Sequence, residues 1–234
     1  MSMKQLLDNE KHSASENIKK ITLFDLDHTL FDSASFRQSL FKLLAKNIGK
    51  EELIEESQRL YETLLANDGV FNPDKFLSIL LEKVEATHKK AELMDIIFDD
   101  NHLKEFIHTD VLTSLTKIAQ ISEIGLFSQG EEKMQRAKIK SIQHFFAKEK
   151  IHISINKKSE IKKIFGLYND YQVFFVDDVL PVLAAVHVHN PAIVTVWIKR
   201  GKYAQLQQPL EDFTAHATIL SLTELVPIIE KGTN

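Results

Sequence analysis

Short apolar runs rich in β-branched and aromatic residues recur along this chain. Several are apolar on both faces, which is typical of strands buried inside a parallel sheet. Helical patterns separate most of these runs, and the alternation predicts an α/β fold built on a doubly wound, Rossmann-like parallel sheet. The expected strands cover residues 21–24, 124–127, 151–155, 173–176, 193–198 and, more weakly, 217–220.

The segments between the later strands have the spacing of amphipathic helices. Shorter helical patterns follow at residues 161–165 and from residue 182 onward. Ser221 and Glu224 have the spacing of a capping box, which predicts the start of the last helix. The most extended pattern predicts one helix that carries five apolar side chains on a face, namely Met134, Ala137, Ile142, Phe145 and Phe146.

The alternation breaks between residues 33 and 108, where no strand pattern occurs. Apolar positions at 36–44, 53–65 and 76–84 each fall on one face of a helix, and 93–98 is a weaker fourth pattern. Asn72 and Pro73 have the chemistry of a helix N-cap followed by a first-turn proline. The segment therefore predicts an all-helical insert placed directly after the first strand.

This pattern divides the chain into three parts. Residues 1–17 are polar and expected to be flexible, residues 18–32 with 109–234 form the α/β core, and residues 33–108 form a helical cap domain. Because the insert leaves the sheet beside the candidate chemistry described below, we expect it to act as a lid. The alternative is a structural helical subdomain with no part in substrate choice.

Composition excludes several classes of protein. The chain has 234 residues, 44% hydrophobic and 26% charged, and a net charge of -4 with 10 histidines, so no basic field favours nucleic acid or a membrane. It has no cysteine, which excludes disulfides, thiolate zinc sites and a thiol nucleophile. The polar start predicts neither a secretory signal nor an anchor, and a cytoplasmic protein is expected.

Two carboxylates follow the first predicted strand. Asp25 and Asp27 are two residues apart, so they share a face of a continuing strand or lie together at its carboxyl tip. Close carboxylates repel each other, and a fold tolerates them best around a cation or as a working pair. One can attack phosphorus as a nucleophile, and the other can move a proton to and from the leaving group. This pair predicts phosphoryl transfer.

Groups that can hold an anion follow the next two strands. Ser128 and Gln129 come after the second strand, where a hydroxyl and backbone N–H groups make an anion cradle. Gln129 is a candidate phosphate contact, with an ordinary turn residue as the alternative. Lys157 and Lys158 follow the third strand, where an ammonium can act as a point charge on a phosphate.

A second acidic pair follows the fourth predicted strand. Carboxylate oxygens at Asp177 and Asp178 suit Mg²⁺, which takes few protein ligands together with substrate oxygens. An Asp pair here can also be a helix N-cap. Because ligands of an open parallel sheet bind beyond the carboxyl ends of its strands, all these groups are expected to meet in one crevice.

With these motifs in this order, the chain resembles the haloacid dehalogenase (HAD) superfamily, and in particular its phosphatases. The resemblance extends from residue 20 to residue 234, and the insert lies where that family places its helical C1 cap. The four motifs that carry it are Asp25-Leu26-Asp27-His28-Thr29-Leu30, Phe127-Ser128-Gln129-Gly130, Lys158-Ser159-Glu160-Ile161 and Val176-Asp177-Asp178.

The resemblance implies a role for each matched residue. Asp25 would attack phosphorus and become an aspartyl phosphate, while Asp27 would protonate the leaving oxygen and then activate water. Ser128 and Lys158 would hold phosphoryl oxygens, with Lys157 as the alternative to Lys158 because a one-residue slip exchanges them. The implied magnesium site comprises Asp25, the backbone carbonyl of Asp27, and Asp177 or Asp178.

The expected function is that of a Mg²⁺-dependent phosphatase acting on a small phosphorylated metabolite. Within the resembled family, members that attack carbon lack an acid two residues after the nucleophile, so Asp27 favours phosphoester hydrolysis. A phosphomutase with the same nucleophile is the first alternative. A non-catalytic module that binds a phosphorylated ligand is the second alternative. In such a module, one or more of the motif residues would be replaced, and none is replaced here.

Overall fold

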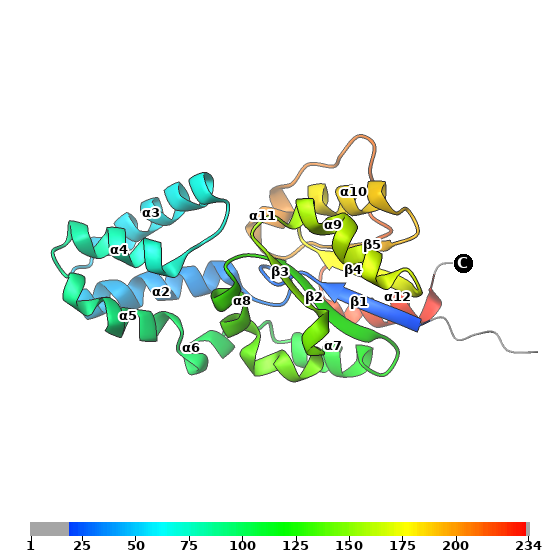
Figure 1. Ribbon diagram of the computed structural model, residues 1–234, viewed down its shortest axis with the longest axis horizontal. Helices are drawn as coiled ribbons and strands as arrows, with labels where there is room; N and C mark the ends of the chain where they lie inside the picture. Colours follow the sequence, from blue (N-terminus) through cyan, green and yellow to red (C-terminus); the bar gives the residue numbers. More distant parts are fainter. Residues whose placement is uncertain (1–18, 233–234) are drawn as a thin grey trace, which may run out of the picture.

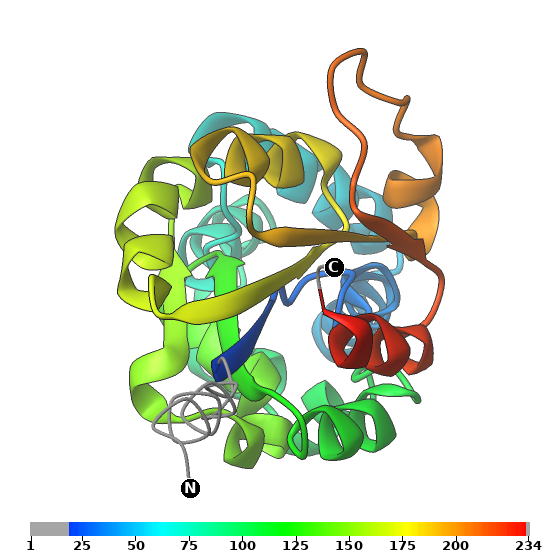
Figure 2. The same cartoon turned by 90° about the vertical axis from the view of Figure 1, so that its right-hand side faces the viewer.

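The computed structural model describes residues 19–232. The expectation of a flexible segment at residues 1–17 lies outside the described residues. The described chain contains a six-stranded, all-parallel sheet with strand order β3-β2-β1-β4-β5-β6, so the predicted α/β fold is confirmed (Figures 1 and 2). The strands are β1 (Lys19–Phe24), β2 (Glu123–Gln129), β3 (Ile151–Ser154), β4 (Tyr171–Asp177), β5 (Val194–Ile198) and β6 (Ala217–Ile219).

Helices cover both faces of the sheet. One face packs against α7 (Val111–Ile118), α8 (Glu132–Ile139) and α12 (Leu225–Lys231), while the other packs against α9 (Lys157–Phe165) and α10 (Leu180–His189). Side chains of β1 alternate between the two apolar clusters, with Leu23 in one and Phe24 in the other. Central strands with both faces buried explain why their sequences read as continuous apolar runs.

The insert after β1 is entirely helical and lies to one side of the sheet (Figure 1). Asn72 caps its third helix, where its side chain accepts a hydrogen bond from the Lys75 N–H at 3.0 Å, with Pro73 in the first turn as predicted. The helices are α2 (Ser33–Ile48), α3 (Leu53–Asp68), α4 (Pro73–Lys83), α5 (Lys90–Ile97) and α6 (Asp100–Lys104), with a 3₁₀ turn at Thr87–Lys89. The sequence pattern did not predict α6.

The predicted helix over residues 134–146 is wrong in its second half. The α-helix α8 ends at Ile139, and a 3₁₀ helix, Lys140–Phe145, continues the chain. Ile139, Ile142 and Phe145 are spaced by three, and a 3₁₀ helix places residues i and i+3 on one face. The spacing that suggested one long helix is therefore equally compatible with this change.

The remaining elements connect the strands. The capping box of Ser221 and Glu224 is present, and it begins a 3₁₀ turn that leads into α12. Within residues 19–232, no helix has both the length and the apolar character needed to cross a membrane. The other connecting elements are α11 (Gly201–Leu206) and 3₁₀ turns at Lys148–Lys150, Gly166–Tyr168 and Leu222–Glu224.

Candidate active site

The carboxyl ends of β1, β2 and β4 meet beside the helical insert. In register, Phe24 of β1 pairs with Leu126 of β2 and with Val176 of β4. The Asp25 N–H donates to the Val176 carbonyl at 2.9 Å, which extends the pairing to the first aspartate. The expected convergence of motif residues at one sheet edge is therefore observed for the groups that follow these strands.

Directly after β1 the chain makes a tight turn that carries Asp27. The Leu26 carbonyl accepts hydrogen bonds from the N–H groups of Leu30 and Phe31 at 2.9 and 3.0 Å. His28 adopts a left-handed backbone conformation, with φ of 63°, which is uncommon for a residue other than glycine. Asp25 is buried, whereas the Asp27 side chain is 30% exposed.

Lys157, rather than Lys158, contacts the candidate nucleophile. Its Nζ lies 2.5 Å from Asp25 Oδ1 and 2.7 Å from Asp177 Oδ2, and the whole residue is buried. Lys158 lines the same cavity but is exposed. Asn156 caps α9 and fixes its start at Lys157, and the next residue points about 100° away around the helix. The preference for Lys158 as the motif lysine is therefore corrected to Lys157.

Three buried carboxylates lie close together, and two of them contact Lys157. Ligand atoms of Asp25, Asp177 and Asp178 all lie within 4.8 Å of one another. Burial raises the pKa of Asp178, and the charges of Asp177 and Asp25 raise it further. Burial also raises the pKa of Asp25, although Lys157 opposes the shift. The cluster holds more negative charge than its lysine balances.

The orphaned oxygen of this cluster belongs to Asp178. Asp178 Oδ2 is buried without a hydrogen-bond partner among the described residues, whereas Asp177 accepts from Lys157 and, at 2.8 Å, from the Val179 N–H. A hard cation such as Mg²⁺ fits this set of donors, since it needs carboxylate oxygens and would offset their repulsion. Of the two aspartates left open by the sequence, Asp178 has the free oxygen.

Asp27 belongs to a separate hydrogen-bond network. Lys138 Nζ lies 2.6 Å from Asp27 Oδ1, Gln135 Nε2 donates to Oδ2 at 2.6 Å, and the Ser33 hydroxyl also donates to Oδ1. Burial alone would raise the pKa of Asp27, but Lys138 and these hydrogen bonds outweigh it and lower the pKa to about 2. Both side-chain oxygens of Asp27 thus accept hydrogen bonds from residues outside the three-carboxylate cluster.

Sequence reasoning missed Ser33, Gln135 and Lys138. A signal for two of them was present, because Gln135 and Lys138 lie on the buried face of α8 together with Met134 and Ile139. Polar residues at apolar positions of an amphipathic helix are a recognisable exception to the pattern. Ser33 carried no comparable signal, since it reads as an ordinary residue at a helix start.

The polar groups expected to bind an anion at the end of β2 already have hydrogen-bond partners within the protein. Ser128 is buried and its Oγ accepts from Gln135 Nε2 at 2.8 Å. Gln129 is exposed, and its side chain joins two elements: Oε1 accepts from the Lys157 N–H at 3.2 Å and Nε2 donates to the Gly69 carbonyl of the insert at 3.3 Å. A Cβ at Gly130 would lie 2.5 Å from the Gln135 side chain, so a larger residue there would displace the amide that bonds Asp27 and Ser128.

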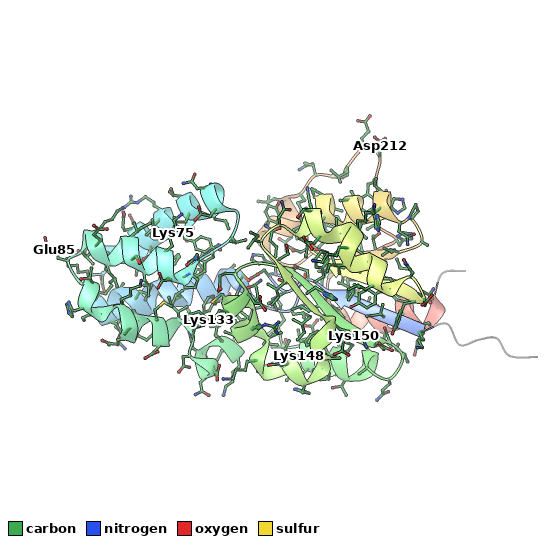
Figure 3. All side chains as sticks on the ribbon, viewed as in Figure 1. Lys75, Glu85, Lys133, Lys148, Lys150 and Asp212 are labelled. Atoms are coloured by element: carbon green, nitrogen blue, oxygen red, sulfur yellow. The ribbon has the colours of Figure 1, made fainter. Side chains whose placement is uncertain are left out.

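These groups face a cavity of about 620 Å³ between the sheet edge and the insert. The lysines that cluster in sequence before β3 do not reach it: Lys148 and Lys150 lie at the amino end of that strand, on the far side of the core from the insert (Figure 3). Lys150 forms an ion pair with Glu123 there. The insert contributes to the lining Ser33, Ala34, Arg37, Tyr61, Leu65, Gly69, Val70 and Phe71.

Comparison with known proteins identifies the fold. No protein-family model matches the sequence, and no curated protein matches it. A haloacid dehalogenase-like hydrolase from Burkholderia xenovorans superposes with a TM-score of 0.73 at 20% identity, covering 89% of this chain and 97% of that one. A HAD hydrolase from Bacillus subtilis bound to magnesium gives 0.62 at 14% identity, with coverages of 90% and 98%.

A 2-haloacid dehalogenase from Pseudomonas syringae is also similar, with a TM-score of 0.61, 17% identity and coverages of 91% and 98%. The three structures thus include both a magnesium-bound hydrolase and a dehalogenase. Their likeness covers the core and the insert together. The chain described here has the fold of the HAD-superfamily hydrolases.

Proposed function

We propose that this chain is a HAD-superfamily phosphatase, a Mg²⁺-dependent phosphomonoester hydrolase that acts on a small phosphorylated metabolite through an aspartyl phosphate at Asp25. The observation that carries the proposal is the buried cluster of Asp25, Asp177 and Asp178, in which one lysine contacts the first two and Asp178 keeps an oxygen without a partner among the described residues. The second support is Asp27, which lines the same cavity two residues after the nucleophile.

The chemistry then divides into two steps. Asp25 attacks phosphorus, the bond from phosphorus to the leaving oxygen breaks, and Asp27, a carboxylate at rest, relays a proton from solvent to that oxygen. Water next attacks the phosphorus of the aspartyl phosphate, its proton passes to Asp27, and inorganic phosphate and the Asp25 carboxylate are regenerated. The low pKa of Asp27 suits its second role, because the group is a carboxylate at neutral pH.

Lys157 and the metal site divide the electrostatic work. Asp25 and Asp178 would hold the cation, with Asp177 close to both. When bound, the cation would supply positive charge that stabilises the phosphoryl oxygens. Lys157 holds Asp25 in place and supplies a fixed positive charge within 2.5 Å of its carboxylate. Ser128 lies beside the same sheet edge and is our candidate for a further phosphoryl contact.

Dehalogenation is the second candidate, because several structures with this fold are 2-haloacid dehalogenases. Those substrates carry a carboxylate but no phosphoryl group. Three buried aspartates, two of which contact the same lysine, suit a Mg²⁺ ion, and protein Mg²⁺ sites share the ion with the oxygens of a substrate phosphate. In dehalogenation the leaving group is a halide ion, which needs no proton from Asp27. Both features favour the phosphatase.

The direct test is phosphate release from a panel of phosphomonoesters, with Mg²⁺ or EDTA, by the wild type and by Asp25→Asn. We expect turnover that requires Mg²⁺ and falls by more than about 10³-fold in the variant. Halide release from a 2-haloacid, measured in parallel, is expected to be absent. Turnover that survives Asp25→Asn would refute the nucleophile, and halide release without phosphate release would replace the proposal with dehalogenation.

A further inference from the structure

Arg37 lines the candidate active-site cavity and forms no ion pair with any residue between 19 and 232. Its Nε is buried without a hydrogen-bond partner, and no carboxylate of the described residues lies within ion-pair distance of its guanidinium. The guanidinium carbon lies 4.9 Å from the centre of the Tyr61 ring. This stacking holds the group in one place, with its nitrogens free for another partner.

The position of Arg37 relates it directly to the proposed chemistry. It lies one helical turn, about 5.4 Å, beyond Ser33 on α2, and Ser33 donates a hydrogen bond to Asp27. Arg37 also lines the cavity together with Asp27 and Lys138. The guanidinium is therefore on the side of the cavity where the leaving group would lie, one turn farther into the insert than the phosphoryl group.

The two buried lysines of the cavity already have partners. Lys138 forms an ion pair with Asp27, and Lys157 forms ion pairs with Asp25 and Asp177. Lys158 also lines the cavity, but it is exposed and belongs to the core side. An anion that enters on the leaving-group side would thus meet Arg37 as its available, partly desolvated partner.

We propose that Arg37 binds a second anionic group on the substrate, so that the substrate is a phosphomonoester whose leaving group carries a carboxylate or a further phosphate. This inference rests on the proposed phosphatase function. The walls near Arg37 are mainly aromatic and aliphatic, formed by Tyr61, Leu65, Val70 and Phe71. They fit a short aliphatic tether between the two anions better than a polyhydroxylated sugar, whose hydroxyls would lack partners there.

Binding of stable phosphonates tests this assignment without turnover. Calorimetric titrations in Mg²⁺ would compare propylphosphonate, its carboxylated analogue phosphonopropionate and the corresponding diphosphonate. The wild type is expected to bind at least one of the two compounds with an anionic tail more than about tenfold tighter than propylphosphonate. The tighter of the two identifies which anion the site takes.

Four variants assign the preference to a residue. Arg37→Met should abolish it and Arg37→Lys should retain part of it, while affinity for propylphosphonate stays within about threefold of the wild type in both. Lys42→Met removes an exposed charge from the same helix, and Lys158→Met removes the exposed charge on the core side; both should keep the preference. Thermal unfolding of each variant checks that it is folded.

The outcomes separate the inference from the function on which it rests. Equal binding of all three phosphonates, or a preference that survives Arg37→Met or disappears only in Lys158→Met, would overturn the role of Arg37 and leave the phosphatase standing. Failure of every phosphonate to bind in Mg²⁺ would instead contradict the phosphoryl site and, with it, both proposals.

Discussion

Lys157 is the residue that holds two of the buried carboxylates of this site in place. Burial disfavours its charged form, but the carboxylates of Asp177 and Asp25 outweigh that effect and raise its pKa. The ammonium therefore stays charged in the interior and holds two carboxylates of the three-carboxylate cluster. A buried charge of this kind is costly to leave unpaired, so each partner depends on the others.

Replacing Lys157 by Met should be much more damaging than replacing its neighbour. Lys157→Met leaves Asp25 and Asp177 without their cation, and we expect a loss of about 3–5 kcal/mol in the free energy of unfolding, measured without Mg²⁺. Lys158→Met should stay within about 0.5 kcal/mol of the wild type, because the side chain is exposed. Equal losses in urea titrations of the two variants would show that Lys157 is misassigned.

Asp178 should control the response of the protein to metal. For the wild type we expect Mg²⁺ at a hundred times its dissociation constant to stabilise the fold by about 2.7 kcal/mol, seen as a higher melting temperature. In Asp178→Asn this increase should largely disappear, because the oxygen without a partner is replaced by an amide. A variant that melts like the wild type with and without Mg²⁺ would rule out Asp178 as a ligand.

For individual residues, the sequence could predict where the site lies but not every residue that belongs to it. Asp25, Asp27, Ser128, Asp177 and Asp178 come together at the sheet edge because each lies within three residues of the carboxyl end of a strand, which a one-dimensional pattern can reveal. The choice between two adjacent lysines could not be made, since it depends on where Asn156 starts a helix. Contacts of Asp27 with residues more than a hundred positions away needed the fold itself.

Among the elements, the start of α7 joins segments that are far apart in the chain. Asp110 precedes that helix, forms an ion pair with Arg200 after β5, and accepts hydrogen bonds from the Ser221 hydroxyl and the Leu222 N–H at 2.7 and 2.8 Å. Arg200 in turn donates to the Thr29 carbonyl at 2.8 Å. This junction therefore supports the turn that carries Asp27.

The junction should make stability depend on pH through Asp110. Burial would raise the pKa of Asp110, but its hydrogen bonds and Arg200 lower it below the ordinary value of 3.8. A lowered pKa gives stability that is complete above the ordinary value and is lost as pH falls through the lowered one. Asp110→Asn should cost about 1–3 kcal/mol at pH 7, and the difference from the wild type should shrink as pH falls below about 4.

Urea titrations across this pH range provide the check, with Asp212→Asn as the control. Asp212 is exposed on a loop remote from the junction (Figure 3), so its replacement should change the free energy of unfolding by less than about 0.5 kcal/mol. A cost of Asp110→Asn that is the same at pH 3 and pH 7 would argue against an ionised Asp110 in the folded protein.

Strands and long helices were the elements that sequence predicted best. All six expected strands are present within a few residues, because apolar runs buried on both faces give a strong pattern. Four helices of the insert, α2 to α5, were recognised from apolar positions that fall on one face of a helix. The break at Ile139 and the short helix α6 were missed, since a spacing of three fits two kinds of helix and five residues are too few for a periodic signal.

In the whole molecule, the insert and the sheet share one apolar cluster. Phe31 after β1 packs against Phe36 of α2, with ring centroids 5.5 Å apart, and Phe106 lies 5.5 Å from Phe36 where the chain returns to the core. The insert is thus packed onto the site that it covers, with Glu85 at its outer end (Figure 3). Division into an α/β core domain and a helical cap domain stays a prediction from the sequence.

The central claim is that this protein hydrolyses phosphomonoesters through a covalent aspartyl phosphate at Asp25. The most direct measurement uses Asp27→Asn with p-nitrophenyl phosphate and Mg²⁺, because this leaving group needs little protonation while the second step still needs its base. We expect a burst of nitrophenolate close to one equivalent of enzyme. Acid quenching and peptide mass spectrometry should then find one phosphoryl group on the peptide that contains Asp25. A burst with that peptide unmodified, or with the phosphoryl group on another residue, would contradict the account.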